Sequence, residues 1–499
     1  MHLIRQHILD IDCSSETFGK ELQNNLSAML EKEFYPRLEK LLNQYSIEGY
    51  IWEIDSLPVE ISEISPENWK EEIVRKSLEQ IEYYLKLNQP QENASKIALN
   101  KTFNSEIYPV EVHAESLFLD FLKKGYIISN SFATDIETII SKLNGNEKLA
   151  DEIVKTFKEN LESLLRWIFS VPEDFKVKIY SFLPFQNEFQ KISELKRQWE
   201  KRYSFSIFSN EIDEKQWYEM IKWMFVFIKT GFSAEITYRF LSVSTEKHWN
   251  IKKEEIFEFL QFITKEKTKD NTDITLKNDE MKFFENWKGY LQKELKIQKI
   301  IPDVAEENYS QIEEKIMSKF EDYNENNLLR EEYIFYVENA GITILHPFLP
   351  MLFEQLGLTE KNEWRTTADI QKAVLLLHYL VYGNTEFQED KMILNKIICG
   401  LSVNEVINIK INLSTEEKEA CEDLLKAVLQ HWKVMSSSSM DALRGTFLQR
   451  KGKLEIQLRG FEIWVEEKGY DILLEQIPWG ITMVKTPWME YHLTCNWNQ

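Results

Sequence analysis

The side chains that most often carry out catalysis occur in this chain without the spacing that catalysis needs. Glu466 and Glu467 lie close to Asp471 and offer a carboxylate pair of the kind that glycoside hydrolases use. In a chain with 82 acidic residues such a pair has almost no specificity, and a solvated hairpin end explains it equally well. His378 and His431 lie in apolar helical segments, where a histidine bonded to a carbonyl is far more common than a metal ligand. The sequence contains no phosphate-loop, dinucleotide-binding, zinc-protease or nucleophile-elbow motif. We therefore predict a protein that is not an enzyme and that holds no cofactor or metal.

Two tryptophans that each follow a proline are the strongest candidates for contacts with another protein. The chain ends in IPWGITMVKTPWM, which places Trp479 and Trp488 nine residues apart. Because a proline restricts the backbone beside it, little entropy is lost when the neighbouring indole is buried. Aromatic anchors of this kind dominate the energy of many protein interfaces. The alternative is that both rings cover the core of their own domain, and the sequence supports it equally.

A short basic patch precedes these tryptophans. Arg444 and Arg450 fall on one predicted short helix, and Lys451 and Lys453 follow it. This patch is the most basic stretch of the last third of the chain and is a second candidate for contact with an acidic partner. Ion pairing within the same domain is the alternative.

Length, composition and charge limit the classes of protein and of partner. A chain of 499 residues is too long for one core, and two to four domains are expected. A hydrophobic content of 43%, with 14 Trp, 20 Tyr and 30 Phe, excludes a disordered chain. The formal net charge of -22 repels phosphate backbones and anionic lipid surfaces. We therefore expect neither nucleic acid nor a membrane as a partner, and a basic protein surface remains an option.

The cysteines and the first residues indicate the compartment. Cys13, Cys399, Cys421 and Cys495 lie far apart and form no Cys-x-x-Cys pair, so we predict buried free thiols in a reducing compartment. The start MHLIRQHILDID has no uninterrupted apolar stretch, which excludes a signal peptide. The apolar runs are shorter than the roughly 20 residues that a membrane span needs. The prediction is a cytoplasmic protein in the cell that makes it.

The pattern of apolar residues predicts a mainly α fold with α+β ends and several domains. Residues 1–90 form an N-terminal βαβα domain: a strand over 3–11, a helical run that Pro36 kinks or divides, a strand over 50–55, and a helix that enters through Ser65 and Pro66. Residues 91–114 are a linker, 115–302 a variable helical region, 303–332 an acidic helix or linker, and 333–499 a C-terminal α+β docking domain.

Three apolar helical segments end in glycine, at 117–125, 224–231 and 376–383. This pattern predicts left-handed C-terminal caps, because glycine reaches that conformation without strain. The segments are either relics of an internal repeat or simply helices that end at a glycine.

The C-terminal domain is predicted to be helical with a β-hairpin tail. Its helices cover residues 348–357, 370–382 and 416–434, and a capping box is expected from Ser438 to Asp441. After Gly452 the apolar period changes from helical to two, which predicts a hairpin turning at Arg459 and Gly460. A final strand covers residues 481–484, between the two Pro-Trp pairs.

The two ends of the chain resemble the contractile injection system tape-measure family, found in phage-tail-like extracellular injection particles. The motifs that carry the resemblance are IRQHILDID and IWEIDSLPVEI near the start, and ILHPFLPMLFEQLGL, LNKIICGL, VLQHWKVM, LRGTFLQRKGKL and LLEQIPWGITMVKTPWM in the last third. The resemblance covers roughly 1–90 and 333–499. It implies a structural or assembly protein that governs the length of the tail tube and associates with tube, baseplate or cap proteins, with self-association as an option. It implies no catalytic residue.

An assembly chaperone or adaptor that is absent from the finished particle is the alternative function. Physical size bears on the choice. An unbroken helix of 499 residues would reach about 750 Å, whereas a compact chain of this length has a radius of gyration of roughly 23 Å. The prolines, hairpin and aromatic residues predict compact domains. We therefore expect folded ends that anchor to particle components, with any length control in the variable middle.

Overall fold

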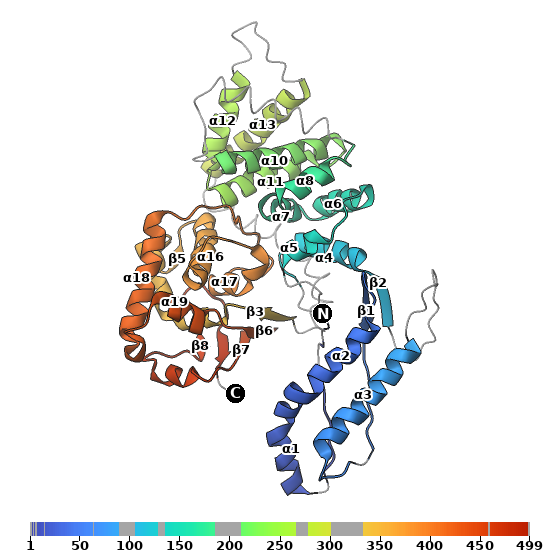
Figure 1. The fold of residues 1–499 in the computed structure, drawn as a ribbon. Coiled ribbons are helices and arrows are strands. Elements are labelled where there is room, and N and C mark those ends of the chain that lie inside the picture. Colours follow the sequence, from blue (N-terminus) through green and yellow to red (C-terminus); the bar gives the residue numbers. More distant parts are fainter. Residues whose placement is uncertain are drawn as a thin grey trace. The chain divides into compact units, whose positions relative to one another are not determined.

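The computed structural model describes most of the chain as two compact units. The described residues are 2, 4, 7–13, 15–62, 64–88, 105–127, 135–184, 211–265, 278–300, 333–457 and 460–497. Unit 1 comprises residues 1–117 and 130–144, and unit 2 comprises residues 118–129 and 145–499. The fold is mainly α, with small sheets in both units, as predicted (Figure 1). The predicted acidic helix or linker at 303–332 lies outside the described residues.

Unit 1 begins with one helical run that changes its hydrogen bonding before a proline. The run consists of α1 (Glu16–Met29), the π-helical turn η1 (Leu30–Phe34) and α2 (Tyr35–Tyr45). Ser15 caps its start by accepting a bond from the amide of Phe18. Pro36 stands in the first turn of α2, where its missing N–H costs little. The run was predicted to kink or divide at Pro36; it continues through Pro36 without a break, and its hydrogen bonding changes in the turn just before that proline.

The second long helix of unit 1 packs against this run. It is α3 (Trp69–Asn88), which starts three residues later than predicted because residues 66–68 form a turn closed by a bond from the amide of Asn68 to the carbonyl of Ser65. Unit 1 also contains α5 (Ile136–Ser141), and α4 (Val110–Lys124) has residues in both units. The buried core lies between the first run and α3; it consists of Leu22, Met29, Phe34, Leu38, Trp69, Ile73, Val74, Ile81 and Leu85.

The sheet of unit 1 differs from the predicted one. The predicted strand over 50–55 is present as β1 (Tyr50–Ile54), with Trp52 and Ile54 packed on the helical core. Its antiparallel partner is β2 (Ser105–Pro109), which comes from the segment predicted as a linker. The predicted first strand is not formed in the described residues 7–13, where Ile8 is 74% exposed. An apolar period of two predicts a strand only where a sheet face covers the side chains, and none does so here.

Unit 2 opens with a helical body whose core is built around tryptophan. Trp167, Trp217, Trp223 and Trp287 are fully buried, and the indole of Trp217 donates to the hydroxyl of Thr245 at 2.8 Å. The helices of this body are α6 (Glu147–Glu159), α7 (Glu162–Ser170), α8 (Glu173–Tyr180), α10 (Glu211–Lys229), α11 (Ala234–Trp249), α12 (Lys253–Lys265) and α13 (Asn278–Ile300).

The three helix ends that were predicted to close with a left-handed glycine all do so. The φ angles are +80° at Gly125, +89° at Gly231 and +70° at Gly383. The amides of Gly125 and Gly383 donate to carbonyls four residues earlier, which satisfies carbonyl groups at the ends of α4 and α16 (Thr367–Tyr382).

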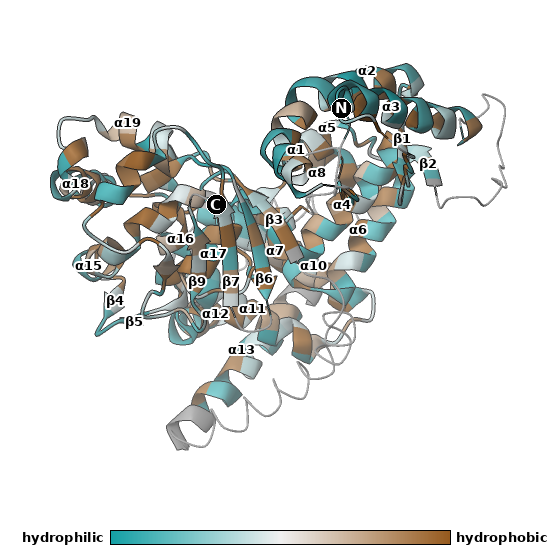
Figure 2. Ribbon diagram, turned by 90° about the horizontal axis from the view of Figure 1, so that it is seen from below, coloured by the Kyte–Doolittle hydropathy of each residue, from teal (hydrophilic) through white to brown (hydrophobic). Residues whose placement is uncertain are grey.

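The C-terminal part of unit 2 contains a five-stranded sheet in the order β3-β6-β7-β9-β8. The predicted hairpin is β6 (Gly452–Gln457) paired antiparallel with β7 (Gly460–Val465). β3 (Tyr333–Val337) pairs antiparallel with β6, and the unpredicted β9 (Leu493–Asn496) lies parallel to β7. The predicted strand over 481–484 is shorter, as β8 (Met483–Val484). In Figure 2 hydrophobic residues gather on α16, α17 (Ile393–Ile398) and the strands beside them.

Helices and short turns complete this part of the chain. α18 (Thr415–His431) starts at a capping box between Ser414 and Glu417, whereas α19 (Met440–Leu443) is capped by Ser439 and not by the predicted Ser438. The remaining elements are η3 (Ala340–Phe348), α15 (Leu349–Gln355), β4 (Thr359–Glu360), β5 (Glu363–Trp364), η4 (Glu389–Lys391), η5 (Lys433–Met435), η6 (Arg444–Leu448) and η7 (Asp471–Gln476). No described helix is long and apolar enough to cross a membrane.

The four cysteines are free, but one of them is not buried as predicted. Cys13 is exposed on the segment before α1, while Cys399, Cys421 and Cys495 are buried. Burial raises the pKa of Cys399 well above its ordinary value, and it raises the pKa of Cys421 and of Cys495 to about 12. A thiol reacts through its thiolate, so the three buried groups should be inert.

We expect iodoacetamide to label Cys13 alone in the folded protein at pH 8. Peptide mass spectrometry after a short exposure should find Cys13 modified at least about tenfold more than any other cysteine, because the other thiols are both buried and protonated. The same reaction in guanidinium chloride should label all four and serves as the control. Comparable labelling of Cys399 in the folded protein would contradict the described burial.

Candidate protein-interaction site

The short helix α15 presents an apolar side chain to solvent at its centre. Leu349, Leu352 and Phe353 point into the core, whereas Met351 is 64% exposed. Pro350 stands in the first turn of the helix, where a proline is well tolerated. An exposed methionine on a helix with a fixed start provides an adaptable contact surface.

Trp479, from the first Pro-Trp pair, covers the start of α15. Its indole N–H donates to the carbonyl of Ile344 at 3.0 Å, and its ring lies edge-on to Phe348 with the ring centroids 5.0 Å apart. The side chain remains partly exposed. The indole is therefore held in one orientation while part of its surface stays available.

Trp488, from the second pair, lies on the other side of the same helix. Its indole N–H donates to the carbonyl of Ile398 at 2.5 Å, and its ring centroid lies 4.6 Å from that of Trp364 and 5.6 Å from that of Phe353. It too is partly exposed. The backbone of Trp488 passes so close to Gly400 that a Cβ there would lie 2.2 Å from its carbonyl oxygen.

These contacts define a surface that we call the α15 face: Pro347, Phe348, Met351, Trp479 and Trp488. The structure brings the two tryptophans together on one helix, and each ring also covers part of its own core. The sequence pointed to the tryptophans but not to Met351 or Phe348. The available signal was HPFLPM, in which two closely spaced prolines fix the backbone around Phe348 and just before Met351.

The rim of the α15 face is acidic. The exposed carboxylates come from α15 itself, from the β4–β5 hairpin that carries Trp364, and from the segments beside the two tryptophans; they are Glu354, Glu360, Glu363, Glu475 and Glu490. Three basic residues lie on the same segments: Arg365 pairs with Glu360 at 3.7 Å, Lys485 donates to the carbonyl of Glu490, and Lys361 is exposed in the β4–β5 hairpin. The five carboxylates outnumber them. The rim therefore favours a basic partner surface.

Arg450 holds its own domain together. It donates to both carboxylate oxygens of Asp471, at 2.7 and 2.8 Å, and its guanidinium lies over the rings of Tyr470 and Trp497. Burial alone would raise the pKa of Asp471, but the bonds from Arg450 and from the amide of Lys468 outweigh it and hold that pKa below its ordinary value. The bonds to Arg450 therefore occupy Asp471, one of the carboxylates that the sequence offered for a glycosidase-like pair.

Arg444 is likewise buried among groups of its own domain. Its Nε donates to the carbonyl of Leu380 at 3.1 Å, its Nη1 pairs with Asp441 at 3.3 Å, and the guanidinium lies over the ring of Tyr379. Arg444 and Arg450 thus bind different groups, and the structure supplies each with partners inside the chain.

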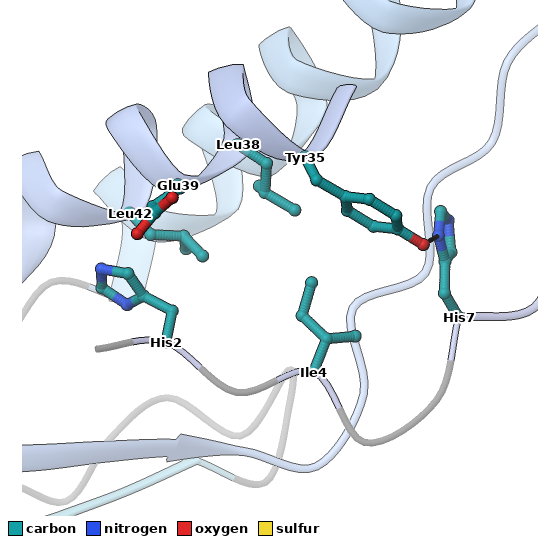
Figure 3. Close-up of a pocket in the computed structure, with 7 residues that line it drawn as sticks. All are labelled: His2, Ile4, His7, Tyr35, Leu38, Glu39 and Leu42. Atoms are coloured by element: carbon teal, nitrogen blue, oxygen red, sulfur yellow. Dashed lines mark hydrogen bonds between the residues drawn. The ribbon is translucent and has the colours of Figure 1, made fainter. Parts of the chain in front are cut away.

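Unit 1 offers a second candidate surface, an open groove of about 410 Å³. Figure 3 shows His2, Ile4 and His7 of the first segment facing Tyr35 and other residues of α2. The ring of His7 lies 3.1 Å from the Tyr35 hydroxyl and stacks on Phe34, and burial lowers the pKa of His7. The groove has no convergent set of catalytic groups. Within the described residues, no group of three or more His, Cys, Asp or Glu could hold a metal ion.

Comparison with known proteins gives one match. The model of a family described as contractile injection system tape measure protein matches residues 1–497. Comparison with curated proteins and with solved structures gave no match.

Proposed function

The chain belongs to the contractile injection system tape measure protein family, a family of structural and assembly proteins of the particle, and from this premise we propose that it acts as a folded docking component. It associates with other components of the tail particle. The finer proposal is that the α15 face binds a tube, baseplate or cap protein, and that the chain is made in the cytoplasm and then incorporated.

The single observation that carries this proposal is the exposed Met351 on α15, a helix that contacts the anchored Trp479 through Phe348 at its start and the anchored Trp488 through Phe353. The indoles of Trp479 and Trp488 are already fixed by bonds to backbone carbonyls, so a partner that covers them does not need to order them. Pre-oriented aromatic rings around an exposed apolar side chain are typical of the centre of an interface. The acidic rim of the α15 face favours a partner surface that is basic. Arg444 and Arg450 are engaged inside the chain, and the proposal does not include them.

The folded state of the described residues supports docking in preference to action as an extended rod. The aromatic core of the helical body and the five-stranded sheet both require a compact chain. The proposal therefore assigns attachment to unit 2. The domain boundaries predicted from the sequence, and a role of residues 115–302 in length control, remain part of this proposal.

We expect Met351→Asp to reduce the amount of this protein in purified particles by about tenfold or more. A carboxylate at the centre of an apolar interface costs at least about 2 kcal/mol, and the acidic rim adds repulsion. The measurement is the ratio of this chain to the tube protein, by quantitative mass spectrometry of purified particles. Val177→Asp is the matched control, because Val177 is equally exposed, at 65% against 64%, but lies on α8.

Two different results would overturn two different parts of the proposal. Equal incorporation of the Met351→Asp and Val177→Asp variants would exclude the α15 face as the docking site. If the unaltered chain is absent from purified particles although their normal assembly requires this chain, the chaperone alternative is favoured instead.

A further inference from the structure

Two bodies of unit 2 meet along a boundary that we call the seam. The helical body comprises the described residues of 118–127 and 145–300, and the sheet body comprises those of 333–497. Among the described elements, α11 against α16 is the most extensive contact across the seam. A ring contact between Tyr126 and Phe335 crosses it as well.

Three fully buried charged side chains lie at the seam. Arg166 of α7 and Lys396 of α17 both contact the same oxygen of Glu389, Oε1, at 3.2 and 3.0 Å. The guanidinium of Arg166 also donates to the carbonyls of Leu122 and Lys123 in its own body and to that of Asn404 in the other. The cluster therefore joins the two bodies through one carboxylate shared by two cations.

The compensation within this cluster is incomplete. Oε2 of Glu389 has no hydrogen-bond partner among the described residues, although the side chain is fully buried. One carboxylate is shared by two cations, and Glu405, which also favours the charge of Lys396, pairs directly with Lys247 instead. Burying charges with incomplete pairing costs more than an apolar contact of the same size would.

The second set of contacts across the seam is also polar. The Gln371 side chain of α16 donates to the carbonyl of Lys247 and lies 2.9 Å from Nδ1 of His248, at the end of α11. The amide group of Asn408 donates to the carbonyl of His248 at 3.2 Å. Lys247 pairs with Glu405 at 2.5 Å. Burial lowers the pKa of His248 to about 3, so this histidine is neutral.

The interiors of the two bodies contrast with the seam. In the helical body Phe157, Trp167 and Trp223 are fully buried, and the ring of Phe157 contacts the rings of the other two. In the sheet body Leu454, Ile463 and Leu493, on β6, β7 and β9, are fully buried. Separation at the seam would return the charged cluster and the Lys247–Glu405 pair to water, whereas separation within a body would expose residues such as these.

We infer that unit 2 opens along this polar seam while both bodies stay folded. The seam is a joint that lets the helical body move away from the sheet body, which carries the α15 face. This inference rests on the buried cluster and the polar contacts around it, and it holds whether or not the α15 face docks.

Hydrogen–deuterium exchange of the intact, unaltered chain tests the inference directly. Peptides covering 244–250 and 400–410 at the seam should exchange at least about tenfold faster than peptides from α10 and from β7, because they become accessible in a partial opening. Exchange of seam and core peptides at one common, global rate would overturn the inference.

A triple variant tests whether the buried charged cluster is the reason why the seam opens. Arg166→Met, Glu389→Leu and Lys396→Met together replace the cluster by apolar side chains of similar size, which often stabilises a buried site. Seam peptides should then exchange about tenfold more slowly than in the unaltered chain, and core peptides should not change. Lys253→Met is the control, because Lys253 of α12 pairs with Glu294 of α13 at 3.4 Å within the helical body. Faster seam exchange in a triple variant with native circular dichroism would contradict the inference. If that variant does not fold, the exchange measured on the unaltered chain tests the inference by itself.

Discussion

Glu389→Gln should weaken the closed form of the seam in unit 2 by about 3–5 kcal/mol, among the largest effects that a single substitution in this chain can have. Glu389 is the shared counter-charge of Arg166 and Lys396, and all three side chains are fully buried. Glutamine keeps the size and the oxygen acceptor but removes the negative charge. Two cations then remain in the interior without a carboxylate. Hydrogen–deuterium exchange of the seam peptides 244–250 and 400–410 measures the change, because both bodies stay folded when the seam opens.

Lys396→Met is the matched control for that result, and it should cost far less. It leaves one cation opposite the shared carboxylate. Burial, opposed by Glu389 and reinforced by Arg166, holds the pKa of Lys396 below its ordinary value, which means that its charge is unfavourable in the fold. The substitution removes the bonds from Nζ to Oε1 of Glu389 and to the carbonyl of Val403. If Glu389→Gln and Lys396→Met proved equally damaging, charge compensation would not be what holds the cluster, and packing volume would explain both.

The charged cluster shows where sequence reasoning stops. Arg166 and Glu389 are 223 residues apart, and no local pattern pairs them. One signal was present: Arg166 interrupts the apolar stretch LLRWIFS, and Lys396 interrupts LNKIICGL. A cation inside an apolar run needs a buried counter-charge, because an unpaired one is too costly. The sequence predicts that such partners exist, but their identity depends on how distant segments pack.

Local features were predictable for local reasons. The left-handed glycines at 125, 231 and 383 follow from apolar helix ends, and the β6–β7 hairpin follows from a change of period, since both depend on neighbouring residues only. The strand expected over 3–11 failed because strand formation requires a partner. The described part of that segment has strand-like composition but no sheet beside it.

The candidate site was predictable in its anchors and not in its geometry. The Pro-Trp pairs identified Trp479 and Trp488, but their hydrogen-bond acceptors, Ile344 and Ile398, lie 135 and 90 residues away. These acceptors belong to ILHPFLPMLFEQLGL and LNKIICGL, two of the motifs that carry the family resemblance. The structure explains why several of these motifs occur together. Gly341, just before the first of them, lies against the backbone of Phe447 in LRGTFLQRKGKL, and Gly400 of LNKIICGL lies against the backbone of Trp488; glycine makes both approaches possible.

Gly341→Ala tests that explanation at the tightest approach in the described chain. A Cβ on Gly341 would lie 1.6 Å from the carbonyl oxygen of Phe447, 2.6 Å from its carbonyl carbon and 2.8 Å from Cα of Leu448. All three are backbone atoms, which cannot rotate away as a side chain can. We expect a loss of at least about 4 kcal/mol, or no soluble protein, because η3 and η6 must separate to admit one methyl group.

Gly445→Ala supplies the control for this substitution, since it lies in η6, two residues before Phe447. A Cβ on Gly445 meets no atom within 4 Å, and its φ is not left-handed. Alanine there should be neutral or stabilise the protein by up to about 1 kcal/mol, through the lower backbone entropy of the unfolded chain. Both expectations are tested by the midpoints of urea denaturation of the two variants, compared with that of the unaltered protein. A midpoint for Gly341→Ala as high as that for Gly445→Ala would mean that η3 and η6 do not approach each other as closely as described. The explanation of the shared motifs by close backbone contacts would then be wrong as well.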